Sequence, residues 1–393
     1  MPWNEIVVLE ARTKFVLAAK VGAAAFASLC RQFGISRKTG YKWRKRYGAG
    51  GVGGLAEASR APRRRPRDHR PWWREALRGA RKARPHWGPK KLRRVLQKAH
   101  PKARTVPAVS TLGRWLRELD LVGRRRRRAR RGPVLAGAKL TVPQAPNHVW
   151  TVDFKGWFRT GEGRRCEPLT VRDLQSRFVL AVVLLANQSD AAVRRAMRRV
   201  FVQYGLPKII RVDNGAPFGG QGALGLARLS VWWLRLGIAV EFTRPAHPQD
   251  NGGHEQMHRI FKAETAAPPA ATLGRQKQRT RAWVKDYNEH RPHEALGQET
   301  PARFYRRSRR RMPRRVGAAH YPRGWEVRRV RNRGQIKWAG RLRFVGRAFV
   351  GEVVGLQAIA AGLHEVYLGP QLIGLMHERD AAGMRPAARQ GRP

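Results

Sequence analysis

Acidic residues are scarce in this chain of 393 residues. Its 26 aspartates and glutamates stand against 82 lysines and arginines, which gives a formal net charge of +56. Such an excess of positive charge repels itself unless anions neutralise it, so it indicates a polyanionic partner such as nucleic acid. A basic structural protein that binds RNA would share this property. The charge therefore predicts the class of partner and leaves open whether the chain is an enzyme.

Cysteine and long apolar runs are rare as well. The two cysteines, Cys30 and Cys166, fall in different predicted segments, which excludes a disulfide framework and a cysteine-rich zinc cluster. The longest strongly apolar stretch, residues 178–186, is far shorter than the ~20 residues that cross a bilayer. The N-terminus shows no signal peptide. We therefore expect a cytoplasmic, nucleoid-associated protein that makes no membrane contact.

The 42% content of hydrophobic residues is sufficient for several separately packed cores. Changes of pattern along the chain predict a multidomain α/β protein with helix-turn-helix units at its N-terminus. The predicted segments are a helix-turn-helix domain at 1–59, a second helical domain at 68–123, a basic linker at 124–142, an α/β domain at 143–308 and a small β-barrel at 320–376.

A helix-turn-helix signature lies near the N-terminus. A short helix over residues 26–33 is followed by Gly34-Ile35-Ser36 and a second helix over 37–47, in which Ser36 can cap the second helix and Trp43 is expected to be buried. The basic face of the second helix suits a major groove, although an ordinary helical hairpin with a solvated face is the alternative. The candidate DNA contacts are Arg37, Lys38, Tyr41, Lys42 and Lys45.

A second unit repeats this plan. One helix is entered through Pro89, and another, over residues 109–119, is expected to be capped by Ser110. Its apolar stripe leaves Arg114 and Arg117 exposed as further candidate DNA contacts. The arginine-rich run at 124–131 is too repulsive to fold alone, so it is a linker or an arm that follows phosphates.

From about residue 143 short strands and helices alternate. Two strands are expected to end at Asp153 and at Asp213, and three others to cover 166–172, 178–185 and 238–242. One helix is expected to end at residue 204, and two others to cover 224–236 and 254–265. The order is βββαβαβα. With acids on the first and fourth strands and on the last helix, this is the ribonuclease-H-like arrangement.

Three acids, Asp153, Asp213 and Glu255, occupy positions that suggest a metal site. The first two end β-branched runs, and Glu255 lies in the first turn of a helix. Hard divalent cations prefer oxygen ligands, and phosphoryl transfer uses such cations. Two further acids are rivals: Asp173 is interpreted as an acceptor of turn hydrogen bonds, and Asp250 as satisfying the N-terminus of the following helix.

Several motifs occur in order along most of the chain. They are the helix-turn-helix segment at 30–43, the strand ends around Asp153 and Asp213, the segment 248–252 with Glu255, and Tyr287-Asn-Glu-His-Arg-Pro-His293. Together they make the chain resemble DDE transposases of bacterial insertion sequences, whose catalytic core is similar to that of retroviral integrases.

This resemblance implies that Asp153, Asp213 and Glu255 are catalytic and bind two Mg²⁺ ions about 3.5–4 Å apart, with Mn²⁺ as a substitute. It implies an integrase core, N-terminal units that bind transposon ends, and Mg²⁺-dependent strand cleavage and strand transfer on double-stranded DNA. Because two ends must be brought together, we expect a homo-oligomer on DNA. A DNA-binding regulator that has lost catalysis is the alternative.

The chain departs from the family pattern in two places. The 41 residues between Asp213 and Glu255 are more than many members have, and Gln256 stands where arginine is usual. His258, Arg259 and Lys262 follow Glu255 at helical spacing, so Arg259 and Lys262 are candidate contacts to DNA phosphates or are simply solvated charges.

Two C-terminal features complete the prediction. The segment 287–296 is expected to dock the end of the α/β domain, with a DNA contact as the alternative for Arg291. Short strands at 325–330, 334–338, 341–345, 352–358 and 363–368 predict the small barrel, and residues 380–393 are expected to be disordered.

Overall fold

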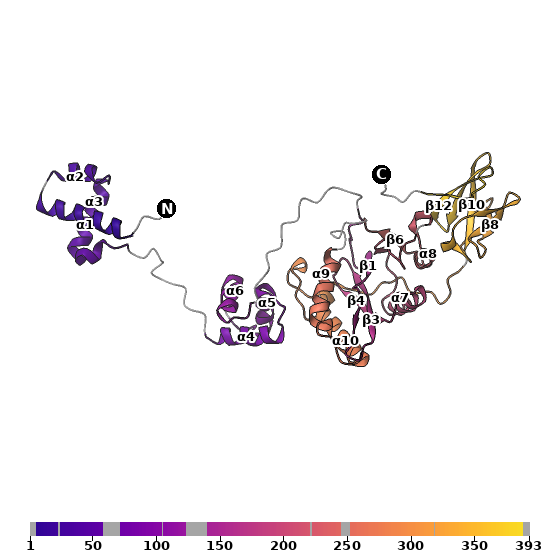
Figure 1. Ribbon diagram of the computed structural model, residues 1–393, viewed down its shortest axis with the longest axis horizontal. Coiled ribbons are helices and arrows are strands. Elements are labelled where there is room, and N and C mark those ends of the chain that lie inside the picture. Colours follow the sequence, from indigo (N-terminus) through magenta and orange to yellow (C-terminus); the bar gives the residue numbers. More distant parts are fainter. Residues whose placement is uncertain are drawn as a thin grey trace. The chain divides into compact units, whose positions relative to one another are not determined.

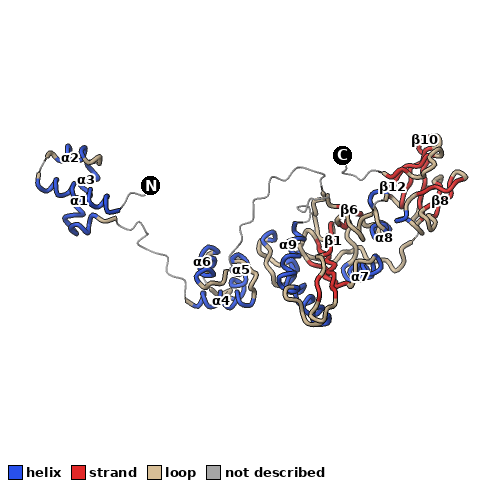
Figure 2. The backbone as a smooth tube through the Cα atoms, in the orientation of Figure 1, coloured by secondary structure: helices blue, strands red, loops and turns tan. Residues whose placement is uncertain are grey.

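The computed structural model describes residues 5–22, 24–57, 71–103, 105–122, 140–220, 222–244, 252–317 and 319–387 (Figures 1 and 2). The basic run at 124–131 and Asp250 lie outside these residues. The chain divides into two compact units, Met1–Arg70 and Pro71–Pro393. Among the described residues, no helix has both the length and the apolar character needed to cross a membrane.

The first unit contains the predicted helix-turn-helix pair. Ser36 caps the second helix, because its side chain accepts a hydrogen bond of 3.2 Å from the Thr39 backbone N–H. Trp43 is buried, as predicted. The structure adds a helix ahead of the pair that the sequence pattern did not predict. The helices are α1 (Glu5–Val21), α2 (Phe26–Gln32) and α3 (Arg37–Gly50).

Gly40 allows the helices of this unit to approach closely. A Cβ atom at this position would lie 2.7 Å from the Cys30 Sγ atom and 2.9 Å from the Phe15 ring. Both distances are shorter than a van der Waals contact. The glycine that is unfavourable for an isolated helix is therefore required where α3 crosses its neighbours.

The second unit begins with three helices around a core of tryptophan and leucine. Two of them were predicted, and the first was not. The predicted cap at Ser110 is wrong, because the N-cap residue of α6 is Ala108, two residues earlier, and no side chain caps the helix. The helices are α4 (Trp72–Ala83), α5 (Pro89–Ala99) and α6 (Val109–Glu118).

A mixed sheet follows, with strand order β2-β3-β1-β5-β6 and with β4 also paired to β3. The β1, β3 and β4 strands are antiparallel neighbours, whereas β5 and β6 run parallel to β1. The predicted order is confirmed, with one additional short strand. The strands are β1 (Val149–Phe154), β2 (Phe158–Arg159), β3 (Arg165–Asp173), β4 (Val179–Leu185), β5 (Ile209–Val212) and β6 (Ala239–Phe242).

Helices cover both faces of this sheet (Figure 1). On one face, Trp150 and Val152 of β1 pack with Phe201 of α7 and Trp233 of α8. On the other, α9 and α10 pack against β4. The helices are α7 (Asp190–Tyr204), α8 (Arg228–Arg235), α9 (Gly252–Phe261), α10 (Leu273–Glu289) and the short α11 (Pro301–Phe304).

Strand alternation decides which side chains meet α9. Because successive residues of a strand point to opposite faces, the burial of Trp150 and Val152 under α7 and α8 turns Thr151 and Asp153 toward α9. Thr170 on β3 also points toward α9, where it contacts His254 and His258. The face that carries Asp153 is therefore the face under α9.

The C-terminal strands form an open sheet and not the predicted closed barrel. The order is β13-β12-β11-β10-β7, and a separate hairpin pairs β8 with β9. In the described residues β7 and β13 are the two edges and do not pair, so the sheet does not close. The strands are β7 (Glu326–Arg329), β8 (Gln335–Trp338), β9 (Arg341–Phe344), β10 (Val353–Ala360), β11 (Leu363–Leu368), β12 (Gln371–His377) and β13 (Arg385–Pro386).

The last strand, β13, pairs with β12 inside the segment expected to be disordered. That expectation is therefore wrong for residues 385–386, while 388–393 lie outside the described part of the chain.

The long spacing between Asp213 and Glu255 joins two cores. Ala223, Leu226 and Val231 from this stretch pack into the hydrophobic core of the C-terminal sheet. The next residues of α8, Trp232 and Trp233, pack into the core of the mixed sheet. The extra residues thus fix the C-terminal sheet to the domain that carries the three predicted acids.

Candidate active site

Asp153 and Asp213 lie on neighbouring parallel strands. Thr151 of β1 pairs with Arg211 of β5, so the two aspartates, each two residues further on, stand at the same level of the sheet. Asp213 is the first residue after β5. The structure therefore brings these two predicted residues together, as the ends of parallel strands allow.

A tight turn orients Asp213. Its carboxylate accepts a hydrogen bond from the Gly215 backbone N–H. The Asn214 side-chain amide donates to the Thr243 carbonyl oxygen at 2.5 Å, which ties the turn to the segment after β6. The Asn-Gly pair thus shapes the loop that presents the carboxylate.

Asp153 experiences the negative charges of the other two predicted acids. Burial, followed by the negative charges of Asp213 and Glu255, raises the pKa of Asp153 to about 7. Burial also raises the pKa of Asp213. Like charges at this range destabilise one another unless a cation lies between them. The donor set, which consists of carboxylate oxygens, therefore fits a divalent cation.

Two buried histidines attach α9 to the sheet. The Thr170 hydroxyl donates to the Asp153 carbonyl oxygen at 2.9 Å, so it must accept from His254 Nε2 (2.5 Å) and His258 Nε2 (2.8 Å). His254 Nδ1 then accepts from the Thr151 hydroxyl at 2.6 Å. One hydroxyl group therefore fixes the tautomers of both rings and the position of the helix that carries Glu255.

With these tautomers, a nitrogen lone pair of His258 faces a carboxylate. Burial lowers the pKa of His258 to about 3, so its Nδ1 is unprotonated, and it lies 3.9 Å from Asp153 Oδ2. Potential ligand atoms of Asp153, His254 and His258 all lie within 4.8 Å of one another. Because Thr170 and Thr151 occupy both ring nitrogens of His254, only the Asp153 carboxylate and His258 Nδ1 remain available to a cation in this cluster.

Sequence reasoning missed this role of the histidines. The spacing predicts His258 on the helix face of Glu255, but the structure separates the two side chains, because His258 is 6% exposed whereas Glu255 is exposed. Their i, i+4 spacing was the available signal. Glu255, Arg259 and Lys262 are not buried with the histidines, so that face of α9 remains open to a ligand.

Of the two other acids considered as ligands, Asp173 lies within the described residues and Asp250 does not. Asp173 is fully buried and accepts hydrogen bonds from the Ser176 backbone N–H (2.7 Å), the Ser176 hydroxyl (2.6 Å) and the Asn147 N–H (2.6 Å). Its interpretation as a turn acceptor is confirmed. The interpretation of Arg291 as a DNA contact is wrong, because its side chain is 2% exposed and pairs with Glu264.

The candidate DNA contacts in the helical units are all at the surface. This is the position that contact with a phosphate or a base edge requires. The exposed residues are Arg37, Lys38, Tyr41, Lys42 and Lys45 on α3, and Arg114 and Arg117 on α6.

Substituting Asp153 with asparagine is expected to stabilise the metal-free protein. The folded-state pKa of about 7 lies above the ordinary unfolded value, so wild type loses stability as pH rises from about 4 to about 7. The asparagine side chain carries no such charge. Urea unfolding in EDTA at pH 8 is expected to show the D153N variant more stable by roughly 2–4 kcal/mol, with no difference at pH 4. Asp190→Asn, at an exposed acid, is the control, and an equal gain there would contradict the argument.

Substituting Thr170 with valine is expected to loosen α9. Valine has nearly the same shape and no hydroxyl, so both histidine Nε2–H groups lose their buried acceptor. We expect a loss of roughly 1–3 kcal/mol in the free energy of unfolding and faster hydrogen exchange in α9. Thr170→Ser keeps the hydroxyl and should behave as wild type. Equal exchange in the valine and serine variants would show that the hydroxyl does not hold the helix.

Four segments of the chain match known protein families. Residues 143–248 and 236–301 match the integrase core domain. Residues 39–116 match a homeodomain-like domain, and residues 325–379 match the C-terminal domain of IS481 family transposases. The first two matches cover the mixed sheet, α9 and α10, and the last covers β7 to β12 of the C-terminal strands.

Two curated relatives come from insertion elements. The chain is 32% identical over 192 residues to the uncharacterized 31.7 kDa protein of IS407 from Burkholderia multivorans, covering 49% of this chain and 66% of the relative. It is 29% identical over 192 residues to the uncharacterized 39.2 kDa protein of IS476 from Xanthomonas euvesicatoria, covering 49% and 53%. The chain thus spans between about half and two thirds of the length of these relatives.

Among solved structures, the HTLV-2 integrase catalytic core domain in complex with magnesium matches with a TM-score of 0.33 and 15% identity. This match covers 42% of the present chain and 99% of the integrase chain.

Proposed function

We propose that this chain, a member of the insertion-sequence transposases with a retroviral-integrase-like core, cleaves DNA at the ends of a mobile element and transfers the resulting 3′-hydroxyl to target DNA. The observation that carries the proposal is the placement of Asp153 and Asp213 at one level of two parallel strands, with the charge of Glu255 acting on Asp153. Carboxylates in this arrangement serve in-line phosphoryl transfer.

In this proposal, Asp153, Asp213 and Glu255 hold divalent cations, Mg²⁺ or in its place Mn²⁺. When bound, such cations stabilise charge on the scissile phosphate and lower the pKa of water. The strands and the Asp213 turn fix two of the carboxylates in advance. The Thr170 hydroxyl and its two histidine partners fix the third through α9.

The remaining parts of the chain are proposed to position DNA. The homeodomain-like match marks the chain as a DNA-binding protein. We assign the end-binding role to residues 1–59 and 68–123, through the exposed basic faces of α3 and α6, and catalysis to residues 143–308. Arg259 and Lys262 extend the open face beyond Glu255 and would hold phosphates near the acids. Synapsis of two ends requires at least two copies on DNA.

The proposal is tested with the element's own ends. A labelled duplex that carries the inverted repeat flanking the coding region is incubated with the protein in Mg²⁺, in Mn²⁺ or in EDTA. We expect a nick that leaves a 3′-hydroxyl at the repeat in either metal and none in EDTA. Specific binding of the duplex without cleavage in Mg²⁺ or Mn²⁺ would instead support a non-catalytic regulator, and equal binding of RNA would refute both.

A further inference from the structure

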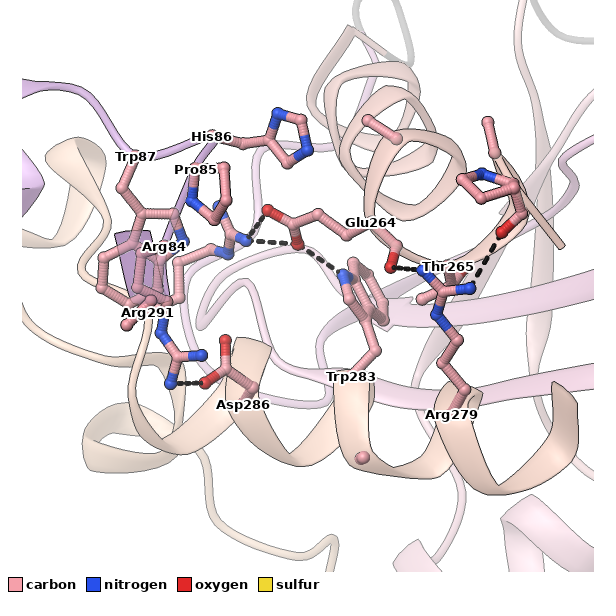
Figure 3. A pocket seen from close by; sticks show the side chains of 15 residues that line it. Arg84, Pro85, His86, Trp87, Glu264, Thr265, Arg279, Trp283, Asp286 and Arg291 are labelled. Atoms are coloured by element: carbon pink, nitrogen blue, oxygen red, sulfur yellow. Dashed lines mark hydrogen bonds and ion pairs between the residues drawn. The ribbon is translucent and has the colours of Figure 1, made fainter. Parts of the chain in front are cut away.

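The α4–α6 helices contact the α/β domain through a buried anchor. Trp87, in the loop between α4 and α5, belongs to the hydrophobic core of the α4–α6 helices, and the guanidinium of Arg291, a residue that is 2% exposed, lies 5.1 Å from the centre of its ring and 5.7 Å from that of Tyr287. Both Glu264 carboxylate oxygens lie 2.5 Å from an Arg291 nitrogen, and Glu264 also accepts from Trp283 Nε1 at 2.7 Å (Figure 3). An arginine held between two rings and a carboxylate is a desolvated contact.

The two segments also line a cleft. The α4–α5 loop supplies Arg84 and Trp87, and α10 supplies Trp283 and Asp286, around a volume of about 560 Å³ (Figure 3). Arg84 pairs with Asp286 across it at 2.5 Å.

A row of ion pairs continues from this cleft along α5. Arg94 pairs with Glu299, and its side chain and that of Glu299 are 30% and 16% exposed. Lys90 pairs with Glu294, and Lys98 lies 3.7 Å from Glu299. In a chain with 26 acids against 82 basic residues, two acids of this segment meet three basic side chains of α5 and offset part of their charge.

Another basic face of the same helical unit is turned to solvent. Arg114 and Arg117 of α6 are exposed, and Arg114 pairs with Glu118 of its own helix, at 3.5 Å. The unit therefore has one face turned to protein and one turned to solvent.

We propose that Asp286, Glu294 and Glu299 form a docking surface for the α4–α6 unit, which holds α6 at a fixed position relative to Asp153. This inference rests on the proposed function, because the docked unit would place end DNA for cleavage. The buried Trp87–Arg291 contact favours a lasting attachment, since exposed ion pairs alone contribute little. The alternative is that DNA competes with the acids for the basic face of α5 and releases the helical unit. An attachment of that kind would not require the buried Trp87–Arg291 contact.

The test is a charge exchange across the Arg84–Asp286 pair, because Glu299 also pairs with Arg303 and lies near Lys98, so an arginine at 299 would face two further cations. Arg84→Glu and Asp286→Arg each place like charges together, and the double variant restores an opposite pair with the signs reversed. Hydrogen exchange is measured on the full chain without DNA, and cleavage is measured at saturating end duplex. Lys102→Glu, at an exposed residue of the same unit, makes the same charge change as Arg84→Glu and is the control.

Each single variant is expected to exchange faster in α5 and in residues 290–299 and to cleave roughly 10–100-fold more slowly, as misplaced substrates do. The double variant is expected to regain protection and most of the cleavage. Unchanged exchange in the single variants, no recovery in the double variant, or faster cleavage in either single variant would overturn the proposal. Exchange reports docking without any reaction, so it separates a failure of docking from a failure of the proposed function.

Discussion

Replacing Asp153 or Asp213 with asparagine, or Glu255 with glutamine, is expected to reduce cleavage of end DNA by at least about 10³-fold, because each removes a charged oxygen ligand from the proposed cation site. Affinity for the duplex should change by no more than about twofold, since binding is carried by phosphate contacts elsewhere. Cleavage is measured by denaturing electrophoresis of labelled duplex at saturating protein.

The control for this experiment is Asp190→Asn, which makes the same chemical change at an exposed acid in the first turn of α7. Thermal unfolding of each variant excludes a loss of fold. If a triad variant cleaves at the wild-type rate, that residue is not a required ligand. If all three do, the proposed active site is wrong.

Reversing two charges on α3, Lys38→Glu with Lys42→Glu, is expected to weaken binding of end duplex by roughly 10²–10³-fold and to lower the slope of log affinity against log salt by about two. Both side chains are exposed on the helix that the Ser36 cap begins. Fluorescence anisotropy over a salt series measures both quantities.

The control for the α3 variant is a single exposed lysine of the same unit, Lys20, which gives the scale of the general charge effect. Lys20→Glu should change the affinity only a few-fold. A loss as large as that of the α3 variant would mean that overall charge, and not the face of α3, governs binding.

The local sequence pattern was enough to predict most of the strands and helices of the α/β domain. In Trp150-Thr151-Val152-Asp153 the alternation of strand residues already separates a core face from a face that carries the acid. Ser36 marked the start of α3. These features depend on neighbours in the sequence, so the sequence displays them directly.

Other features could not be predicted, because they depend on contacts between residues that are distant in the sequence. Short strands fit an open sheet as well as a closed barrel, and only the pairing of the first and last strands distinguishes the two, so the predicted barrel was wrong. The sequence did not explain the long stretch between Asp213 and Glu255. The structure does, because Ala223 and Val231 of this stretch pack into the core of the C-terminal sheet. A DNA contact was the alternative for Arg291 until the structure showed its carboxylate partner, Glu264.

The sequence by itself indicated the partner class through its net charge, determined the order of strands and helices through their periodicity, and singled out the three acids that are proposed as ligands through their place at strand ends and a helix start. Only the tertiary structure decided that His254, 84 residues beyond Thr170, shares that hydroxyl with His258, and that Arg94 meets Glu299. The reason is physical: periodicity records which face of an element is apolar, whereas the partner of a buried polar group is set by how distant elements pack.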